Sequence, residues 1–117
     1  MVNNRVKPKV IISPRICKAL SIFIDVGAIT LYPFIISREK MDKQLLNHEM
    51  IHIKQQEELL VIGFYLLYGM WWLQGILKGM SSKAAYYAIP FEVEAYVHDE
   101  DMRYLKKRKH WAWKRYI

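Results

Sequence analysis

The stretch "NHEMIHIKQQEELL", residues 47–60, contains the pattern that decides the fold. Two histidines, His48 and His52, lie four residues apart, and Glu49 follows the first of them. Apolar residues recur around them at helical spacing. Asp42, a good N-cap residue, precedes the periodic segment. The pattern therefore predicts a helix that begins just after Asp42 and carries both histidines.

The spacing of the two histidines suits a metal site. Residues four apart project from one face of a helix, so His48 and His52 lie side by side. Two imidazoles placed in this way can bind one zinc ion. Glu49 borders the same face and can accept a proton from a water that the metal activates. The alternative is a chance match, with two surface histidines on an ordinary helix.

A catalytic zinc needs a third protein ligand and an open position for water. The segment "PFEVEAYVHDE", residues 90–100, offers Glu92 and Glu94, which point about 200° apart on a helix. Only one of them can face the histidines. We favour Glu92, because the small Ala95 lies on its side of the helix and lets this helix approach the histidine-bearing helix closely. We keep Glu94 in reserve. The three acidic residues that follow are expected to be solvated surface charges: Asp99, Glu100 and Asp101.

The two motifs together resemble the gluzincin zinc metallopeptidases. The resemblance rests on "HEMIHIKQQEELL" (48–60) and "FEVEAY" (91–96) and covers about residues 45–100. It is closest to the membrane-bound sensor peptidases of β-lactam signalling and to the prenyl-protein and heat-shock membrane endopeptidases, and in size to the minigluzincins. It implies a zincin-like fold, with Zn²⁺ held by three ligands and one general base. The ligands would be His48, His52 and Glu92, and the base Glu49.

Two further positions and one segment can be compared with the family pattern. The family's acidic residue five positions after the second histidine corresponds to Glu57. The family's aspartate four positions after the metal-binding glutamate orients a ligand histidine, and Tyr96 occupies that position here. A carboxylate would be a stronger acceptor for the histidine N–H than the Tyr96 hydroxyl, and another group, such as Asp99 or a backbone carbonyl, is the alternative that would orient the histidine. The family also holds substrate backbone on an edge strand before the zinc helix. In this sequence that strand would be residues 28–37, with a plain core strand as the alternative.

The N-terminal third is expected to form a small β-sheet or hairpin. The segments "KVIIS" (9–13) and "AITLYPFIIS" (28–37) are rich in β-branched and aromatic residues, as strands are. Pro33 makes the second an edge or bulged strand. Residues 13–25 fit either a short helix capped by Ser13 or the first arm of a hairpin. With residues 1–8 loose, the expected class is α+β.

The apolar run that follows the motif is long enough to span a membrane. Residues 59–77 number 19 and include only one strongly polar side chain, Gln74. A straight helix through this run would carry the chain too far for Glu92 to return to the histidines. A break near Gly63 or Gly69 resolves this, as does an extended return through residues 78–90. We favour a broken helical hairpin that is either buried or dipped into a membrane.

The remaining segments complete a single domain, residues 1–117. Residues 78–83 break the apolar helix, and Pro90 opens a last helix over roughly 91–106. The tail "KKRKHWAWKRYI" (106–117) is basic and aromatic, which suits a lipid interface. No nucleic-acid-binding module surrounds it, so nucleic acid is not an expected partner. His98 and His110 are expected at the surface.

The composition fits a folded, membrane-associated protein. The net charge is +7 and 53% of the residues are hydrophobic, which disfavours disorder. Cys17 is the only cysteine, so an internal disulfide is excluded and a buried free thiol is expected. No secretory signal peptide is visible. A membrane-associated location is preferred, with a cytoplasmic one as the alternative.

The sequence thus predicts a zinc-dependent metallopeptidase that hydrolyses peptide bonds in peptide or protein substrates. The alternative is a non-catalytic metal-binding protein, or a helical membrane or interaction protein.

Overall fold

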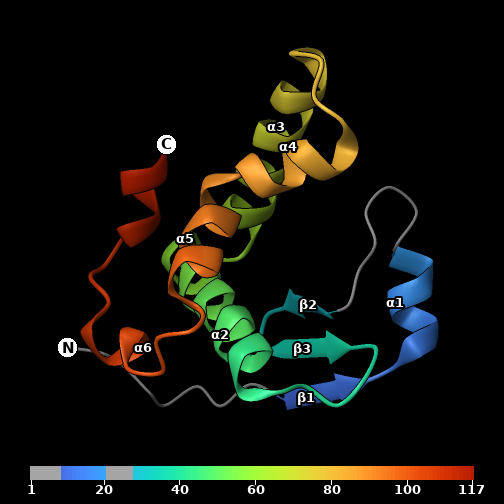
Figure 1. Ribbon diagram of the computed structural model, residues 1–117, viewed down its shortest axis with the longest axis vertical. Helices are drawn as coiled ribbons and strands as arrows, with labels where there is room; N and C mark the ends of the chain where they lie inside the picture. The colour runs from blue at the N-terminus through green and yellow to red at the C-terminus, as the bar shows by residue number, and fades with distance from the viewer. Residues whose placement is uncertain (1–8, 21–27) are drawn as a thin grey trace.

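The computed structural model describes residues 9–20 and 28–117 (Figure 1). The predicted α+β class is confirmed, because a small sheet is followed by a helical region. Expectations for residues 1–8 and for a hairpin arm within 21–27 lie outside the described residues. The elements, in chain order, are β1 (Lys9–Ile12), α1 (Pro14–Leu20), β2 (Ala28–Leu31), β3 (Phe34–Ser37), α2 (Lys43–Glu58), α3 (Ile62–Leu77), α4 (Ser82–Ala88), α5 (Pro90–His98), α6 (Tyr104–Lys107) and the 3-10 helix η1 (Ala112–Tyr116).

The sheet has the strand order β1-β3-β2, with β1 parallel and β2 antiparallel to β3. The prediction of one strand over residues 28–37 is wrong. The segment folds into two strands joined by a turn at Tyr32 and Pro33. Proline has no N–H to donate and a fixed φ, so it suits the turn better than the strand. β2 is consequently an edge strand, and Figure 1 shows it close to α2.

The segment after β1 forms a helix, α1, with Pro14 as its first residue. The Ile16 N–H donates to the Ser13 hydroxyl at 3.3 Å, so Ser13 caps the helix as one of the two alternatives predicted. Cys17 packs in the core with its thiol 3.9 Å from the Ile36 carbonyl. Burial raises the pKa of this thiol. Cys17 is therefore buried, as expected from the sequence.

α2 begins as predicted, because the Asp42 carboxylate accepts a hydrogen bond from the Leu45 N–H at 2.8 Å. The break after α2 comes earlier than predicted, at residues 59–61 rather than at Gly63 or Gly69. The Val61 N–H bonds to the Gln56 carbonyl at 2.7 Å, and Leu60 adopts a positive φ of 55°. This is the Schellman termination of a helix, usually marked by glycine. The chain bends by 111° between α2 and α3.

α3 and α4 pack against each other as a helical hairpin that extends away from the sheet (Figure 1). A Cβ at Gly75 would lie 2.8 Å from the Ala85 Cβ, so the glycine permits this close approach. α4 is not predicted by the sequence, which favours a break over residues 78–83 and offers an extended return through 78–90 as an alternative. The last helix is also shorter than predicted: α5 ends at His98, and α6 follows after a turn.

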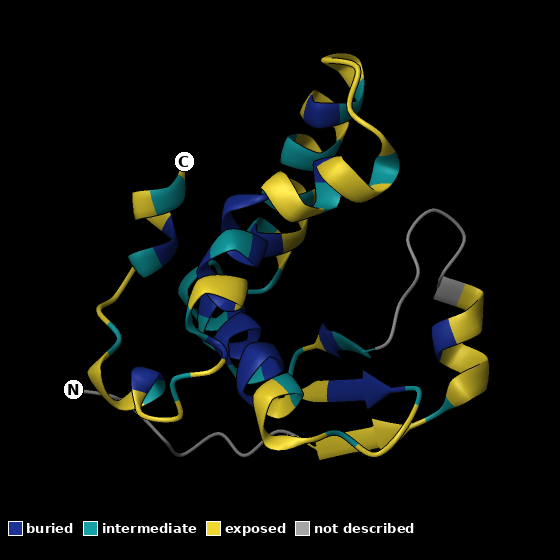
Figure 2. Cartoon of the chain, viewed as in Figure 1, coloured by how far each residue is buried: buried dark blue, intermediate teal, exposed yellow. Residues whose placement is uncertain are grey.

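Two hydrophobic clusters lie where α2, α3, α5 and the C-terminal residues meet, and Figure 2 shows that most of β3 is buried as well. Ala95 of α5 packs on Ile51 of α2, so the small residue lets the two helices approach as predicted. A second cluster is aromatic and joins α3 to the tail. Its buried members are Phe64, Ile89, Phe91 and Trp113, packed against Trp71 and Trp72 among others.

Among the described helices, none is both long and apolar enough to cross a membrane alone. α2 and α3 together reach the required length and hydropathy, but only as a sharply bent pair. α3 packs one side on the core and exposes the other. Five apolar side chains on its exposed side form what we call the α3 stripe: Ile62, Leu66, Met70, Leu73 and Leu77.

Candidate metal centre

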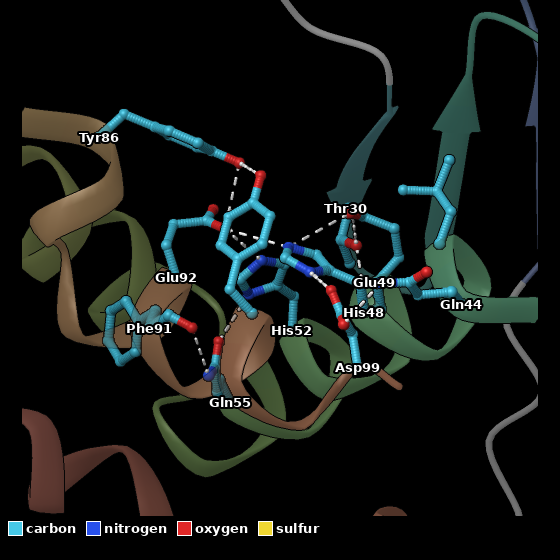
Figure 3. Close-up of polar contacts among 12 residues, drawn as sticks. Thr30, Gln44, His48, Glu49, His52, Gln55, Tyr86, Phe91, Glu92 and Asp99 are labelled. Carbon is cyan, nitrogen blue, oxygen red and sulfur yellow. Dashed lines mark hydrogen bonds and ion pairs between the residues drawn. The ribbon is translucent and has the colours of Figure 1, made fainter. Parts of the chain in front are cut away.

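The two motif histidines and Glu92 converge between α2 and α5 (Figure 3). His48 Nε2 lies 3.1 Å and His52 Nε2 lies 3.2 Å from the same oxygen, Glu92 Oε1. All three side chains are buried. Glu49 adjoins them, and ligand atoms of His48, Glu49 and His52 lie within 4.8 Å of one another. This buried group can hold a metal ion.

Both histidine rings are oriented by acceptors on their other nitrogen. His48 Nδ1 donates to Asp99 Oδ2 at 3.0 Å. His52 Nδ1 lies 2.7 Å from Gln55 Oε1. The oxygen and nitrogen of the Gln55 amide cannot exchange places, because its Nε2 donates to the Phe91 carbonyl at 3.0 Å. With the hydrogen on each Nδ1, each neutral ring presents the Nε2 lone pair to the centre.

The lone pairs and the carboxylate require a positive charge between them. Two Nε2 lone pairs facing one carboxylate oxygen repel one another unless a proton or a cation lies among them. In the protein without metal, a proton takes this role on His52. Burial lowers the pKa of His52, but the Glu92 charge outweighs this and raises the pKa to about 9. A metal cation satisfies the same three atoms, which are the donor types that such ions bind.

The Glu92 carboxylate is fixed by two tyrosines in addition to the histidines. The Tyr68 hydroxyl donates to Oε2 at 2.7 Å, and the Tyr86 hydroxyl donates to Oε1 at 3.2 Å. Burial alone would raise the pKa of Glu92, but the two histidines together hold it well below its usual range. Glu92 is therefore a pre-positioned anion that turns Oε1 toward both rings.

Glu49 lies beside these three residues and is held from the sheet. Thr30 Oγ1 of β2 lies 2.8 Å from Glu49 Oε1, and Glu49 Oε2 lies 3.9 Å from His48 Nε2. Burial raises the pKa of Glu49, although the charges of the two histidines oppose the shift. A carboxylate with a raised pKa is a better proton acceptor, which is what a general base needs.

The reserve candidate Glu94 points to the other side of α5. It is fully buried and is bound by Arg108 Nε at 2.6 Å, by the Tyr104 hydroxyl at 2.6 Å and by Gln55 Nε2 at 2.9 Å. Arg108 also forms a two-pronged ion pair with Glu58. Burial raises the pKa of Glu94, but Arg108 and Tyr104 outweigh it and lower the pKa overall. Glu94 thus joins α5 to the tail.

Asp99 takes the orienting role that the sequence analysis offers, as an alternative, to Asp99 or to a backbone carbonyl. It was expected to be a solvated charge, yet it is only 5% exposed and accepts the His48 Nδ1 hydrogen bond. The carboxylate absent at Tyr96 is thus supplied three residues later, after the end of α5. Tyr96 stacks its ring edge-on against His48, at 4.4 Å between centroids, and its hydroxyl meets Tyr86. No local pattern marks Asp99, because its position depends on where α5 ends.

Replacing Asp99 should weaken metal binding without abolishing it. Outer partners of metal-bound histidines typically contribute about 10–100-fold to affinity. We expect Asp99→Asn to fall in this range by competition with a fluorescent chelator, and the exposed neighbour change Glu100→Gln to have no effect. We also expect no gain from Tyr96→Asp, since His48 already has its carboxylate. A large gain from Tyr96→Asp would contradict this assignment.

The remaining candidates lie apart from the centre. His98 stacks on Tyr104, and its Nε2 lies 2.8 Å from the Tyr116 hydroxyl. His110 is largely exposed, as predicted. Glu57 receives the Tyr32 hydroxyl at 3.2 Å and pairs with Lys54. Of the other two acidic residues expected at the surface, Glu100 is exposed and Asp101 pairs with Lys107.

The centre opens into a cleft of about 930 Å³. β2 and α2 form one side, α3 and α4 the other, and α5 contributes Glu92 and Tyr96. The walls carry a large share of aromatic side chains: Phe64, Tyr65, Tyr68, Trp72, Tyr86, Tyr87 and Tyr96. A polar, buried cluster within a mostly apolar cleft is the usual arrangement of a small-molecule or peptide site.

Comparisons with protein-family models, with curated proteins and with solved structures find no match to this chain.

Proposed function

We propose that the chain is a zincin-like, gluzincin-type metallopeptidase that hydrolyses peptide bonds. His48, His52 and Glu92 would hold Zn²⁺ through the three atoms that converge in the buried centre. One observation carries the proposal: two histidine Nε2 lone pairs and a carboxylate oxygen meet within 3.1 and 3.2 Å. Ligands about 2.0–2.1 Å from one tetrahedral zinc lie about 3.3 Å apart, which agrees with this spacing.

The chain's own residues supply the proton transfers. A bound zinc ion supplies Lewis-acid activation of a water molecule and of the peptide carbonyl. Glu49 accepts a proton from the water as the water oxygen bonds to the carbonyl carbon. Glu49 then returns that proton to the amide nitrogen as the C–N bond breaks. Thr30 holds the Glu49 carboxylate in position. Asp99 and Gln55 keep the histidine Nε2 atoms turned inward.

Peptide cleavage with and without metal tests the proposed function. The zinc-loaded chain should cleave members of a mixed peptide library, with the products detected by mass spectrometry. A chelator should abolish cleavage, and added zinc should restore it. Stoichiometric zinc binding without any cleavage would instead favour the non-catalytic metal-binding protein.

We also propose that the chain associates with membranes through the α3 stripe. Ile62 and Leu77 at its two ends are 72% and 79% exposed. No position of α3 carries a charge, whereas Lys78 and Lys83 lie just beyond its end. An apolar face with basic residues beside it suits an anionic lipid interface, and the net charge of +7 adds to the attraction.

Co-sedimentation with vesicles measures this association. The chain should bind vesicles that contain phosphatidylglycerol more strongly than vesicles of phosphatidylcholine alone. Leu66→Glu should reduce binding at least tenfold, since it places a charge in the lipid contact (roughly 1.4 kcal/mol per tenfold). The matched control Val97→Glu changes an exposed apolar residue of α5 and should leave binding unchanged. Equal loss with both variants would contradict the role of the stripe.

A further inference from the structure

Side chains of α2 and α3 close the outer edge of β2 at its C-terminal end. The Thr30 carbonyl and the Tyr32 N–H are outward groups of this edge. The Gln56 side-chain amide forms a hydrogen bond with each of these groups. Its Nε2 donates to the Thr30 carbonyl and its Oε1 accepts from the Tyr32 N–H, each at 2.9 Å. The Tyr65 hydroxyl donates to the same carbonyl at 2.5 Å. The amide therefore substitutes for the backbone of an added strand.

This closure is buried and internally satisfied. Gln56 is 0% exposed and Thr30 is 3% exposed. Gln56 Nε2 also lies 3.3 Å from the Tyr65 hydroxyl, so the two closing side chains support each other. A peptide that displaced Gln56 would leave its buried amide without partners, which is unfavourable. A bound chain can therefore pair with β2 only before this point.

The residues that line the cleft end at the same point of β2 as the hydrogen bonds of Gln56 and Tyr65. β2 contributes Ala28, Ile29 and Thr30 to the cleft, but not Leu31 or the turn that follows. Gln56 and Tyr65 line the cleft beside Thr30. We call these two side chains the end wall.

The end wall lies close to the proposed general base. Thr30 contacts Gln56 and Tyr65 through its carbonyl, and Glu49 through its hydroxyl. A strand advances about 3.3 Å per residue, so only about one or two substrate residues fit between the base and the wall. Substrate on that side of the cleaved bond must therefore be short.

We infer, on the basis of the proposed peptidase function, that the cleft takes the amino-terminal end of a peptide chain. Antiparallel pairing is the more stable arrangement for an added strand. β2 runs toward the end wall, so an antiparallel peptide begins at the wall and runs outward past Ala28. The chain would thus release about one or two residues from the amino terminus.

Binding of a peptide length series tests the inference without requiring activity. Fluorescent peptides share one central sequence and carry zero to four extra residues on either the amino or the carboxyl side. Fluorescence anisotropy with the metal-free chain gives the affinities. We expect more than two amino-side residues to weaken binding at least tenfold (roughly 1.4 kcal/mol) and carboxyl-side residues to have little effect.

Opening the end wall should remove the limit on length. Tyr65→Ala should restore binding of the amino-extended peptides to within about threefold of the short ones. Tyr87→Ala, a matched change elsewhere in the cleft, should not. Gln56→Ala serves as a second variant that opens the end wall, and thermal unfolding shows whether each variant is folded. If neither variant is folded, the length series with the wild-type chain decides the test.

The outcomes separate this inference from the proposed function. Equal affinity for all lengths, or cleavage deep inside amino-blocked long peptides, would overturn the inference and leave the peptidase standing. A limit on the carboxyl side would overturn the amino-terminal assignment. Length-dependent binding without cleavage by the zinc-loaded chain would support the inference and reject the peptidase. No binding and no cleavage of any peptide would overturn both.

Discussion

Glu49→Gln should leave zinc binding nearly intact and reduce peptide turnover by about 10²–10⁴-fold, the usual contribution of general acid–base catalysis. Glutamine keeps the size of the side chain and an oxygen that can still meet the Thr30 hydroxyl, which lies 2.8 Å from Glu49 Oε1. It removes the group that accepts the proton. The measurement is kcat on a cleaved library peptide, together with zinc content by mass spectrometry.

A matched change on the same helix controls this experiment. Glu57→Gln replaces a carboxylate that pairs with Tyr32 and Lys54, away from the centre. It should leave kcat within about threefold of wild type, as expected for a group outside the proton transfer. If wild type and Glu49→Gln hold zinc and turn over equally, Glu49 is not the base.

The second large effect separates the two glutamates of α5. Glu92→Gln should reduce zinc affinity by more than the roughly 10–100-fold of an outer partner, because it removes a ligand charge. Glu94→Gln makes the same chemical change two residues away and should cost less than about tenfold in affinity. It should instead destabilise the fold by about 3–5 kcal/mol, because Arg108 would remain buried with one partner lost.

Competition with a zinc chelator measures the zinc affinity of both variants, and unfolding by denaturant measures their stability. The reverse ranking of affinities would move the third ligand to Glu94 and reject the alignment with the gluzincin pattern. Equal stability of Glu94→Gln and wild type would contradict the structural role of the Arg108 ion pairs.

Features with a local chemical cause could be predicted from the sequence. The start of α2 follows from the Asp42 cap, and the shared face of His48 and His52 follows from helical spacing. The approach of α5 to α2 followed from the small size of Ala95. The α+β class followed from strand-like segments ahead of a helical pattern. Apart from the approach of α5 to α2, which joins distant segments, these conclusions required only residues close together in the chain.

Features that depend on tertiary contacts could not be predicted in the same way. The break after α2 lies at Leu60, a residue that gives no sign of a positive φ. Asp99 is expected among three surface acids, and its alternative role beside His48 depends on where α5 ends. The hydrogen bonds of Gln56 to the edge of β2 could not be predicted either, because nothing in the sequence distinguishes Gln56 from any other glutamine on a helix. In each case a distant segment decides the role of the residue.

The metal centre itself is most directly tested by anomalous diffraction at the zinc edge, using crystals of the chain reconstituted with zinc. The account predicts one ion per chain, bound by His48 Nε2, His52 Nε2 and one Glu92 oxygen, with Asp99 still bonded to His48 Nδ1. Data from the same crystals above and below the edge would distinguish zinc from other ions. Fully reconstituted protein without a peak at these atoms, or with its peak at Glu94 or at a surface histidine, would contradict the account.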